Sequence, residues 1–297
     1  MSRSRLDERG VALVAVLWLL ALVAAVAVGF ATTTRTEVGL VRNLVDNARL
    51  RHIADAGVSA AVALLLDPRQ AAAFCADGRG FTFRFEGEAV HVRLQDEGGK
   101  IDLNEAPAPL LRGLFVAVGE TPERAASLAA ALVDWRDADD RTEPGGAEAQ
   151  AYVAASRSSG PKNAPFEAIE ELAAVLGISA ELYARLRPHV TVHSHIGGVD
   201  PAFATPVALA AVPGFSLELV QDYLRARAQG PACATPPPPS AAALPFMAGS
   251  PRLAFGVTVD VKTRDGAAFR REAVIGVGTG SEHPFLRLAW RTGMSAE

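Results

Sequence analysis

The densest group of side chains that could do chemistry is a run of carboxylates between residues 134 and 148. It comprises six acids across the predicted end of a helix and a Gly-Pro loop: Asp134, Asp137, Asp139, Asp140, Glu143 and Glu148. Hard cations such as Ca²⁺ take six to eight oxygen ligands, which a flexible loop can deliver. The spacing differs from that of an EF-hand, so a solvated acidic loop with one Asp capping a helix is the competing interpretation.

Two further groups of reactive side chains lie elsewhere in the chain. Cys75 and Cys233 come just before a predicted hairpin and just after a helical block. If the ends of that block meet in an oxidising compartment, the two can be bridged, and two unpaired thiols are the alternative. His193 and His195 share one face of an extended segment and could bind a transition metal, but surface histidines near a loop are the favoured interpretation. The sequence contains no nucleophile motif, phosphate loop or dinucleotide fingerprint.

Composition excludes several classes of protein. The chain has 297 residues, of which 49% are hydrophobic and 21% charged, so it is neither disordered nor a many-spanning membrane protein. Lys and Arg total 29 against 33 Asp and Glu, and this net charge of −4 disfavours a general nucleic-acid binder. Two cysteines exclude a disulfide-scaffolded mini-protein and a four-cysteine zinc site.

The N-terminus carries the strongest compartment signal. Residues 11–31 are apolar, without charge or proline, and three arginines precede them. A helix of this length spans the roughly 30 Å hydrocarbon core, and the arginines favour a cytoplasmic N-terminus. A secretory signal peptide cut near residues 25–27 and a plain signal anchor are two interpretations, although the run is longer than most signal peptides. A third interpretation is a short leader that ends at Gly10, the residue between the charged N-terminal segment and the apolar run.

The helical pattern continues beyond the apolar run to about Leu66, where Asp67-Pro68 stops it. Apolar residues between 40 and 65 recur at helical spacing and alternate with polar ones. The sequence therefore predicts one long N-terminal helix over residues 11–67, transmembrane over 11–31, with an amphipathic second half that packs on a small sheet. A membrane anchor followed by an unrelated helical linker is the alternative.

The rest of the chain is predicted to be α+β. Alternating runs at 81–86 and 89–94, joined by Gly87-Glu88, indicate a β-hairpin, and strands return at 253–262, 267–277 and 285–290. Helices are predicted at 107–118, 121–137, 165–177, 179–186, 202–212 and 216–228, with a strand-like segment at 190–193. A large all-α insertion over 105–229 thus interrupts a small α/β domain with an antiparallel sheet, made of 68–104 and 230–297. A Pro-rich linker at 231–245 precedes the C-terminal strands.

The insertion resembles helix-hairpin-helix (SAM-like) domains around Gly177 and Gly214. In DNA-binding versions, backbone amides of such hairpins contact phosphates and basic residues assist. Residues 105–229 carry ten Lys and Arg against sixteen Asp and Glu, a net charge of −6. This acidic balance favours a protein–protein or purely structural role.

Three features together resemble a known family. A leader of residues 1–10 that ends in Gly10, directly before an apolar helix, is similar to type IV prepilins, in which a membrane peptidase would cut between Gly10 and Val11. Ordinary pilins have Glu at the fifth mature position, where this chain has Ala15. This departure, the D-E-G-G-K-I-D-L-N run at 96–104 and the D-W-R-D-A-D run at 134–139 resemble the general secretion pathway protein K family, the K-type minor pseudopilins of type II secretion systems.

The resemblance implies a non-enzymatic subunit with one pass through the bacterial inner membrane, a cytoplasmic N-terminus and most of the chain in the periplasm. It would stand at the tip of the pseudopilus, nucleate its assembly and support export of folded proteins. Implied partners are I-, J- and H-type minor pseudopilins, the G-type major pseudopilin, the prepilin peptidase and inner-membrane lipid, with no nucleic acid.

Some family members bind calcium at the acidic run, so Ca²⁺ is the one implied cofactor. Two functions from other classes remain open. One is a membrane-anchored competence protein that binds DNA through its helix-hairpin-helix repeats, and a more distant one is an anchored periplasmic hydrolase.

Overall fold

A computed structural model describes residues 7–231, 233–263, 266–278 and 284–293, and within the N-terminal helix it leaves out the side chains of residues 7–11, 29–39 and 42–43. The chain divides into two compact units, at residues 1–52 and 53–297. Each unit is described by itself.

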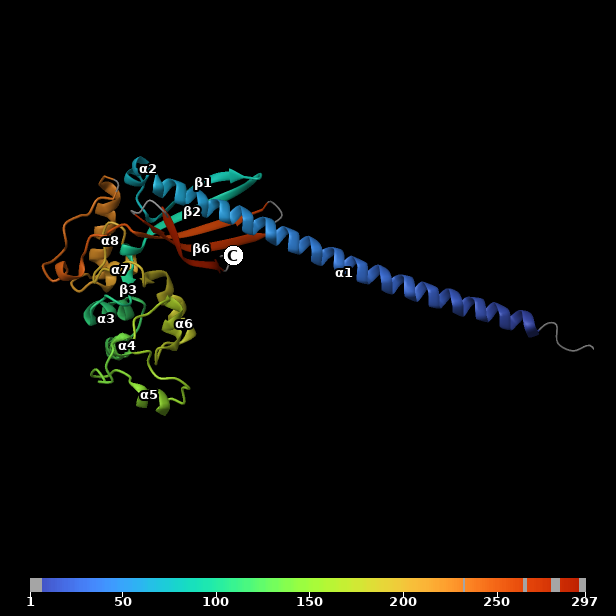
Figure 1. Cartoon of the computed structure of the whole chain (residues 1–297), viewed down its shortest axis with the longest axis horizontal. Helices are drawn as coiled ribbons and strands as arrows, with labels where there is room; N and C mark the ends of the chain where they lie inside the picture. Colours follow the sequence, from blue (N-terminus) through green and yellow to red (C-terminus); the bar gives the residue numbers. More distant parts are fainter. Residues whose placement is uncertain (1–6, 232, 264–265, 279–283, 294–297) are drawn as a thin grey trace, which may run out of the picture. The chain divides into compact units, whose positions relative to one another are not determined.

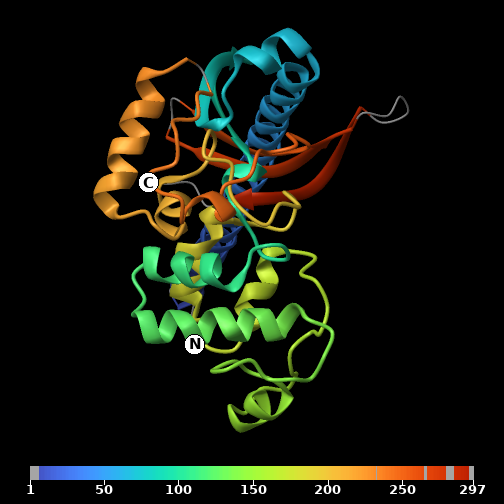
Figure 2. The ribbon, with the colours of Figure 1, turned by 90° about the vertical axis from the view of Figure 1, so that its left-hand side faces the viewer.

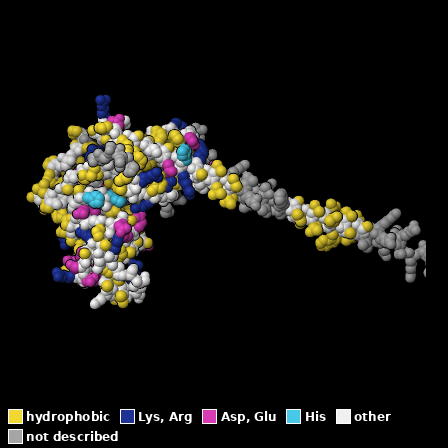
Figure 3. All heavy atoms as spheres, viewed as in Figure 1, with side chains coloured by type: hydrophobic (Ala, Val, Ile, Leu, Met, Phe, Trp, Pro, Cys, Tyr) yellow, Lys and Arg dark blue, Asp and Glu magenta, His cyan; other side chains and the backbone are white. Residues whose placement is uncertain are grey.

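The first unit holds most of helix α1 (Asp7–Leu66), which is 60 residues long. Every described side chain from Ala12 to Val28 is exposed, and Figure 3 shows them as a mostly apolar surface. Among the described residues no helix is both long and apolar enough to cross a membrane. The predicted transmembrane helix at 11–31 is therefore not shown. The predicted cleavage site, Gly10 and Val11, and residues 29–31 at the other end of the range are among those whose side chains are not described.

The second unit is built on a five-stranded antiparallel sheet with the strand order β1-β2-β5-β6-β7 (Figure 1). Its strands are β1 (Asp77–Phe85), β2 (Glu88–Asp96), β5 (Ala254–Lys262), β6 (Ala268–Val277) and β7 (Phe285–Gly293). The predicted hairpin and the three C-terminal strands are confirmed, and so is the α+β class. Strands β1, β2 and β7 are longer than predicted because pairing extends beyond the alternating apolar runs, whereas β5 and β6 agree with the prediction to within one residue.

The last four turns of α1 pack on this sheet. Ile53, Val58 and Val62 are buried, and so are Val90 and Val259 in the strands. At Gly57 the helix approaches so closely that an added Cβ would lie 2.5 Å from Val259 Cγ1. The helix ends at Leu66, as predicted, because Asp67 caps the short helix α2 (Pro68–Ala73) and accepts a hydrogen bond from the Arg69 amide at 2.9 Å.

A long insertion leaves the sheet after β2 and returns at β5, two strands that are direct neighbours. Its elements, shown in Figure 2, are η1 (Glu97–Gly99), β3 (Ile101–Asp102), α3 (Ala108–Ala117), α4 (Pro122–Arg136), α5 (Ala149–Ala154), η2 (Ile169–Ala174), α6 (Ala180–Leu186), η3 (Arg187–His189), β4 (Val190–Thr191), α7 (Pro206–Ala211), α8 (Leu217–Gln229) and η4 (Leu244–Phe246). Strand β3 pairs in parallel with β4, so the segment after β2 belongs to the insertion's own small sheet.

The insertion has its own apolar core. Its largest fully buried side chains come from several helices and from the segment around β3: Tyr152, Phe115, Ile101, Leu103, Leu110, Leu111, Leu114, Leu132, Leu172 and Leu182. Side chains cap the main helices, with Thr121 accepting from the Arg124 amide and Ser179 from the Leu182 amide. These caps explain why α4 and α6 begin where predicted.

One predicted helix is wrong and one was missed. Residues 165–177 form only the 3-10 segment η2, because Glu171 Oε1 turns back and accepts hydrogen bonds from the Glu167 and Ala168 amides at 2.8 and 3.1 Å. Helix α5 was not predicted, and its Tyr152 is buried with its hydroxyl accepting from the Leu176 amide.

Candidate functional site

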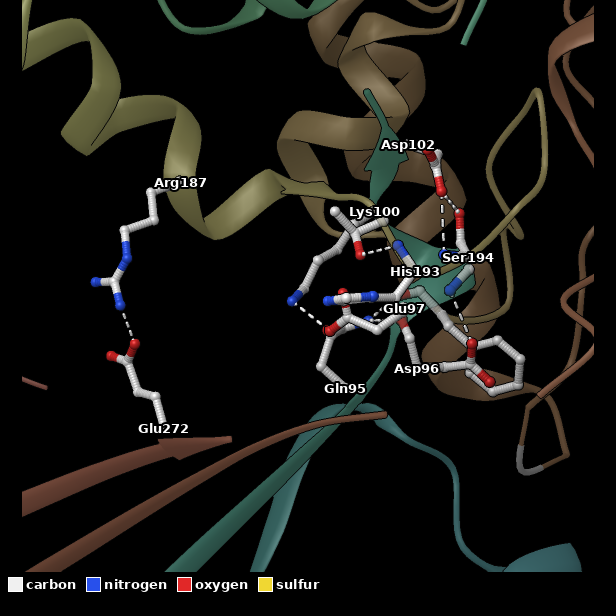
Figure 4. A network of polar contacts seen from close by, with 12 residues as sticks. Gln95, Asp96, Glu97, Lys100, Asp102, Arg187, His193, Ser194 and Glu272 are labelled. Carbon is white, nitrogen blue, oxygen red and sulfur yellow. Dashed lines mark hydrogen bonds and ion pairs between the residues drawn. The ribbon is translucent and has the colours of Figure 1, made fainter. Parts of the chain in front are cut away.

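The run at 96–104 forms the junction between the sheet and the insertion (Figure 4). Asp96, the last residue of β2, caps η1: its Oδ1 accepts hydrogen bonds from the Gly98 amide at 2.9 Å and the Ser250 hydroxyl at 2.6 Å. Ser250 precedes the returning strand β5, so one carboxylate ties the outgoing chain to the incoming chain. Asp200 adds to this tie, since its Oδ2 accepts from the Ser250 amide at 2.7 Å.

The two glycines of this run are required by close packing. A Cβ at Gly98 would lie 2.5 Å from Ser250 Cβ, and a Cβ at Gly99 would lie 2.3 Å from the Phe203 carbonyl oxygen. The adjacent Glu97 is also buried, and Lys100 Nζ neutralises it at 2.6 Å. The side chains of this run therefore act as structural connectors.

Asp102 is the most heavily bonded carboxylate of the junction. It is fully buried, and its Oδ2 accepts from the Ser194 amide at 3.1 Å, the Ser194 hydroxyl at 3.0 Å and the His195 amide at 2.9 Å. Its Oδ1 accepts from the Asn104 amide at 2.9 Å. The segment containing His193 and His195 thus wraps around Asp102, a structural role that sequence reasoning missed because the partners lie about ninety residues apart.

The second motif run connects to the first. Arg136, inside the D-W-R-D-A-D run, donates hydrogen bonds to the carbonyls of Leu103 and, at 2.7 Å, Ala106. Asn104 pairs with the backbone of Phe166 in both directions, at 2.9 and 2.7 Å. The two motifs are therefore parts of a single packing unit.

Two ion pairs join the insertion to the last two strands of the sheet, β6 and β7. Arg187 in η3 contacts Glu272 in β6, as Figure 4 shows, and Glu170 in η2 contacts Arg291 in β7 at 2.5 Å. These side chains are partly exposed, so each pair contributes little to stability by itself. Together with the junction they hold the insertion in one position on the sheet.

Burial sets the charge state of Asp96. Desolvation raises the pKa of this carboxyl to about 6, although hydrogen bonds from Ser250 and Gly98 and the nearby Arg252 oppose the shift. A carboxyl whose pKa is raised on folding stabilises the fold most at low pH. Its contribution declines as the pH rises from about 4 through about 6.

The acidic loop is organised by Asp134. This residue is fully buried, and its two oxygens accept from the Glu143 amide at 3.0 Å and the Ala147 amide at 2.6 Å. Asp139 Oδ1 accepts from the Arg141 amide, and Asp140 Oδ1 accepts from the Asn163 side chain. Asp134 lies in the last turn of α4 and binds amides of the loop that follows, so it holds the loop and does not cap a helix.

The loop also contains oxygen atoms that lack a partner among the described residues. These buried atoms are Asp137 Oδ1, both carboxylate oxygens of Glu148 and Asn163 Oδ1. Burial, and then the charges of nearby carboxylates, raise the pKa values of Glu148 and Asp137. All are oxygen donors of the type that Ca²⁺ prefers. However, no group of three or more His, Cys, Asp or Glu in the described part of the chain is arranged to hold a metal ion.

Cys75 and Cys233 lie in one small cluster with Ala202 and Phe203. The condition for a bridge, that these two segments lie close together, is therefore met in the structure. A bond between them stays a prediction.

An apolar groove runs between the end of α1 and the strands β6 and β7. It encloses about 480 Å³, and its apolar lining consists of Val58, Val62, Ala63, Leu66, Ile275, Phe285 and Trp290. Beside it, Arg271 bonds Asp55 Oδ1 at 2.9 Å and lies 5.0 Å from the Trp290 ring centroid. Strand β7 also presents Leu286 and Leu288 to solvent, so it carries four exposed large apolar side chains, more than any other described element after α1.

The two glycines of the predicted helix-hairpin-helix repeats both lie in turns, although the element before Gly177 is a 3-10 segment. Gly177, between η2 and α6, and Gly214, between α7 and α8, both have positive φ, at 89° and 93°. Such values favour glycine, which explains these residues without any phosphate ligand.

Comparisons with known proteins agree with these features. The family model for type II secretion system (T2SS), protein K, matches residues 92–195, which include the junction and the acidic loop and end at the residue whose amide bonds Asp102. The type II secretion system protein K of Klebsiella pneumoniae is 29% identical over 249 residues, 74% of this chain and 76% of that protein. That of Dickeya chrysanthemi is 39% identical over 126 residues, 40% of this chain and 34% of that protein.

Among solved structures, a chain in the crystal structure of the GspK-GspI-GspJ complex from the enterotoxigenic Escherichia coli type 2 secretion system is similar. The TM-score is 0.59 at 20% identity, covering 88% of this chain and 99% of that chain. The shared fold defines the class: a helix packed on an antiparallel sheet that carries a large helical insertion. In sequence, the chain is similar to type II secretion system protein K, whose family model matches about a third of it and whose Klebsiella pneumoniae member aligns over most of it.

Proposed function

We propose that this protein is a minor pseudopilin of a type II secretion system, a structural subunit without catalytic activity. The main observation behind the proposal is that the residues matched by the family model include those that join the sheet to the insertion. Residues 92–195 contain both motif runs, and the contacts of Asp102 and Arg136 explain why those runs occur together.

The proposed location is the inner membrane, with most of the chain in the periplasm. The apolar run at 11–31 would anchor the protein after a prepilin peptidase cuts between Gly10 and Val11. A helix of that length matches the hydrocarbon thickness, and the preceding arginines favour a cytoplasmic leader. Ala15 would then occupy the fifth mature position, where it offers no carboxylate to a neighbouring N-terminal ammonium.

The proposed position is the tip of the pseudopilus, in contact with I- and J-type minor pseudopilins. The similar solved chain comes from a GspK-GspI-GspJ complex, which supports these two partners. The insertion of residues 97–246 between two neighbouring strands adds bulk that would obstruct a subunit stacked above it. H-type and G-type pseudopilins would follow below, so this subunit would nucleate assembly and support export.

The groove between α1 and β7 is the proposed contact surface for the I- or J-type partner. Exposed apolar patches mark interaction sites, and this one combines a groove with an edge of the described sheet. We expect the full-length protein in detergent to retain I- and J-type pseudopilins, and Phe285→Asp to reduce that retention at least about tenfold because it places a charge against the apolar partner.

The matched control is Leu217→Asp, which introduces the same charge at an exposed apolar position of α8 and should leave retention unchanged. Equal retention by both variants would show that the groove is not the contact surface. If the wild type retained neither partner but bound duplex DNA at physiological salt, the competence-type function would replace the proposal.

Calcium binding at the acidic loop is a second part of the proposal. Glu148 and Asp137 would supply the free oxygens, while Asp134 holds the loop and Asp139, Asp140 and Glu143 surround it. A cation there would neutralise carboxylates that otherwise repel one another. Ion binding to the folded state alone raises stability by mass action.

We therefore expect millimolar Ca²⁺ to raise the melting temperature of the full-length protein over its value in EDTA. Glu148→Gln should remove most of this increase, and Glu123→Gln, an exposed acid at the start of α4, should not. Because the pKa values of Glu148 and Asp137 are raised, protons compete with the ion, and the increase should shrink as the pH falls through those values. An identical melting temperature in Ca²⁺ and EDTA at neutral pH would leave only a solvated loop.

A further inference from the structure

We propose that Cys75 and Cys233 form an intramolecular disulfide that clamps the exit of the insertion to the start of the sheet domain. Cys75 lies between α2 and β1, and Cys233 lies just after α8, so the bond would close a loop of roughly 160 residues around the insertion. The proposal rests on the periplasmic location proposed above, because disulfides persist in oxidising compartments.

The first observation is the placement of the two thiols. Cys75 is only 2% exposed, and Cys233 packs with it against Ala202 and Phe203. Burial, and then a hydrogen bond with the Cys233 thiol, raise the pKa of Cys75 to about 12. Two thiols in direct contact need little movement to form a bond.

The second observation is the backbone of Cys233. Its φ is 59°, in the left-handed region that residues other than glycine rarely adopt. The Ala234 amide donates to the Pro231 carbonyl at 2.9 Å, which closes a turn around Cys233. An unfavourable conformation persists only where the surroundings hold it, and here it directs the cysteine into the cluster with Cys75.

Both cysteines are attached to fixed parts of the unit. The carbonyl of Ala76, next to Cys75, accepts from the amide of Asp96 at 2.7 Å, beside the junction. Near Cys233, Arg227 in α8 donates to the carbonyls of Pro201 and Ala204 at 3.0 and 2.9 Å. A bond between the two cysteines would therefore connect two anchored segments rather than two free ends.

The reaction needs a two-electron oxidant, which we take to be a dithiol–disulfide oxidoreductase of the periplasm. The Cys233 thiolate, the more exposed of the two, attacks the oxidant's disulfide and forms a mixed disulfide while one oxidant sulfur leaves as a thiolate. The Cys75 thiolate then attacks Cys233 Sγ, and the second oxidant sulfur leaves. The chain loses two protons and two electrons, and the oxidant becomes a dithiol. Because the thiol of folded Cys75 resists deprotonation, this step belongs to folding, before burial is complete.

The test counts thiols in the full-length protein extracted from membranes, unfolded without reductant and treated with a maleimide. We expect no labelled cysteine, two after reduction, and a monomer without reductant, since the chain has only two cysteines. Dithiothreitol should lower the melting temperature by roughly 5–15 °C. The double variant Cys75→Ser/Cys233→Ser should show no such effect.

A second experiment tests whether the disulfide forms independently of the proposed periplasmic location. Reduced, unfolded protein is refolded with glutathione disulfide as the oxidant, and we expect the same monomeric bond. Two reactive thiols after this refolding, or a disulfide-linked dimer, would overturn the clamp. Bond formation in vitro combined with two free thiols in the membrane extract would instead overturn the proposed periplasmic location.

Discussion

Replacing Asp102 by Ala is expected to lower the free energy of unfolding by about 3–5 kcal/mol. The carboxylate is fully buried and accepts four hydrogen bonds, from the amides of Asn104, Ser194 and His195 and from the Ser194 hydroxyl. Alanine would leave four donors without this acceptor, two of them on the buried Ser194, and each loss of a buried bond costs about 1–3 kcal/mol. Chemical denaturation of the full-length protein, followed by circular dichroism, measures the change.

One variant at the same site and one control at a distant surface position test the size of this effect. Ser194→Ala removes one of the four donors and should cost about 1 kcal/mol. Asp222→Ala, which removes an exposed carboxylate paired with Arg225 in α8, should change stability by less than about 0.5 kcal/mol. If Asp102→Ala unfolded within about 1 kcal/mol of the wild type, the carboxylate would not be holding the two chain segments together.

Replacing Gly113 by Ala is expected to lower the free energy of unfolding by about 2–3 kcal/mol. Helix propensity alone predicts the opposite, an increase of roughly 1 kcal/mol. Gly113 lies in α3, where an added Cβ would be 1.9 Å from the carbonyl oxygen of Ala211 in α7. Because the obstructing atom belongs to the backbone, α3 and α7 must move apart. Thermal unfolding of the two proteins gives the comparison.

The control for this prediction is Gly249→Ala. Gly249 has no atom within 4 Å of the position of an added Cβ, so the substitution should be close to neutral. Stability of Gly113→Ala equal to that of the wild type would mean that the two helices tolerate a wider separation.

Local chemistry explains most of the elements that were predicted correctly. Thr121 and Ser179 cap the helices that follow them, and Asp67-Pro68 ends α1, all through hydrogen bonds or steric limits within four residues. The hairpin of β1 and β2 likewise follows from alternation and a short turn. Such signals lie in the chain segment itself, so one sequence is sufficient to detect them.

The wrong and missing helices have a different origin. At 165–177 the carboxylate of Glu171 competes for backbone amides, and Lys162 holds it at 3.1 Å from outside the predicted helix. Helix α5 is only six residues long and is stabilised by burial of Tyr152 in a core built from distant helices. Its own sequence carries no comparable periodic signal.

In the acidic loop, residue types alone identified the region but not the role of each carboxylate. Their density correctly marked a special region, but six similar carboxylates gave no basis for separating Asp134, whose two oxygens bind loop amides, from Glu148, whose oxygens have no partner among the described residues. That division depends on which amides the folded loop presents, and these come from residues 9 and 13 positions away from Asp134.

By itself, then, the sequence determined the α+β class, the long N-terminal helix, the insertion within the sheet domain and the resemblance to the protein K family. These follow from local periodicity, caps and short motif runs. Only the tertiary structure decided what the motif residues do: Asp96 ties β2 to the segment before β5 through Ser250, and Asp102 binds the His193–His195 segment. The physical reason is that a buried carboxylate takes its role from the donors around it, and here those donors lie 92 to 154 residues away along the chain.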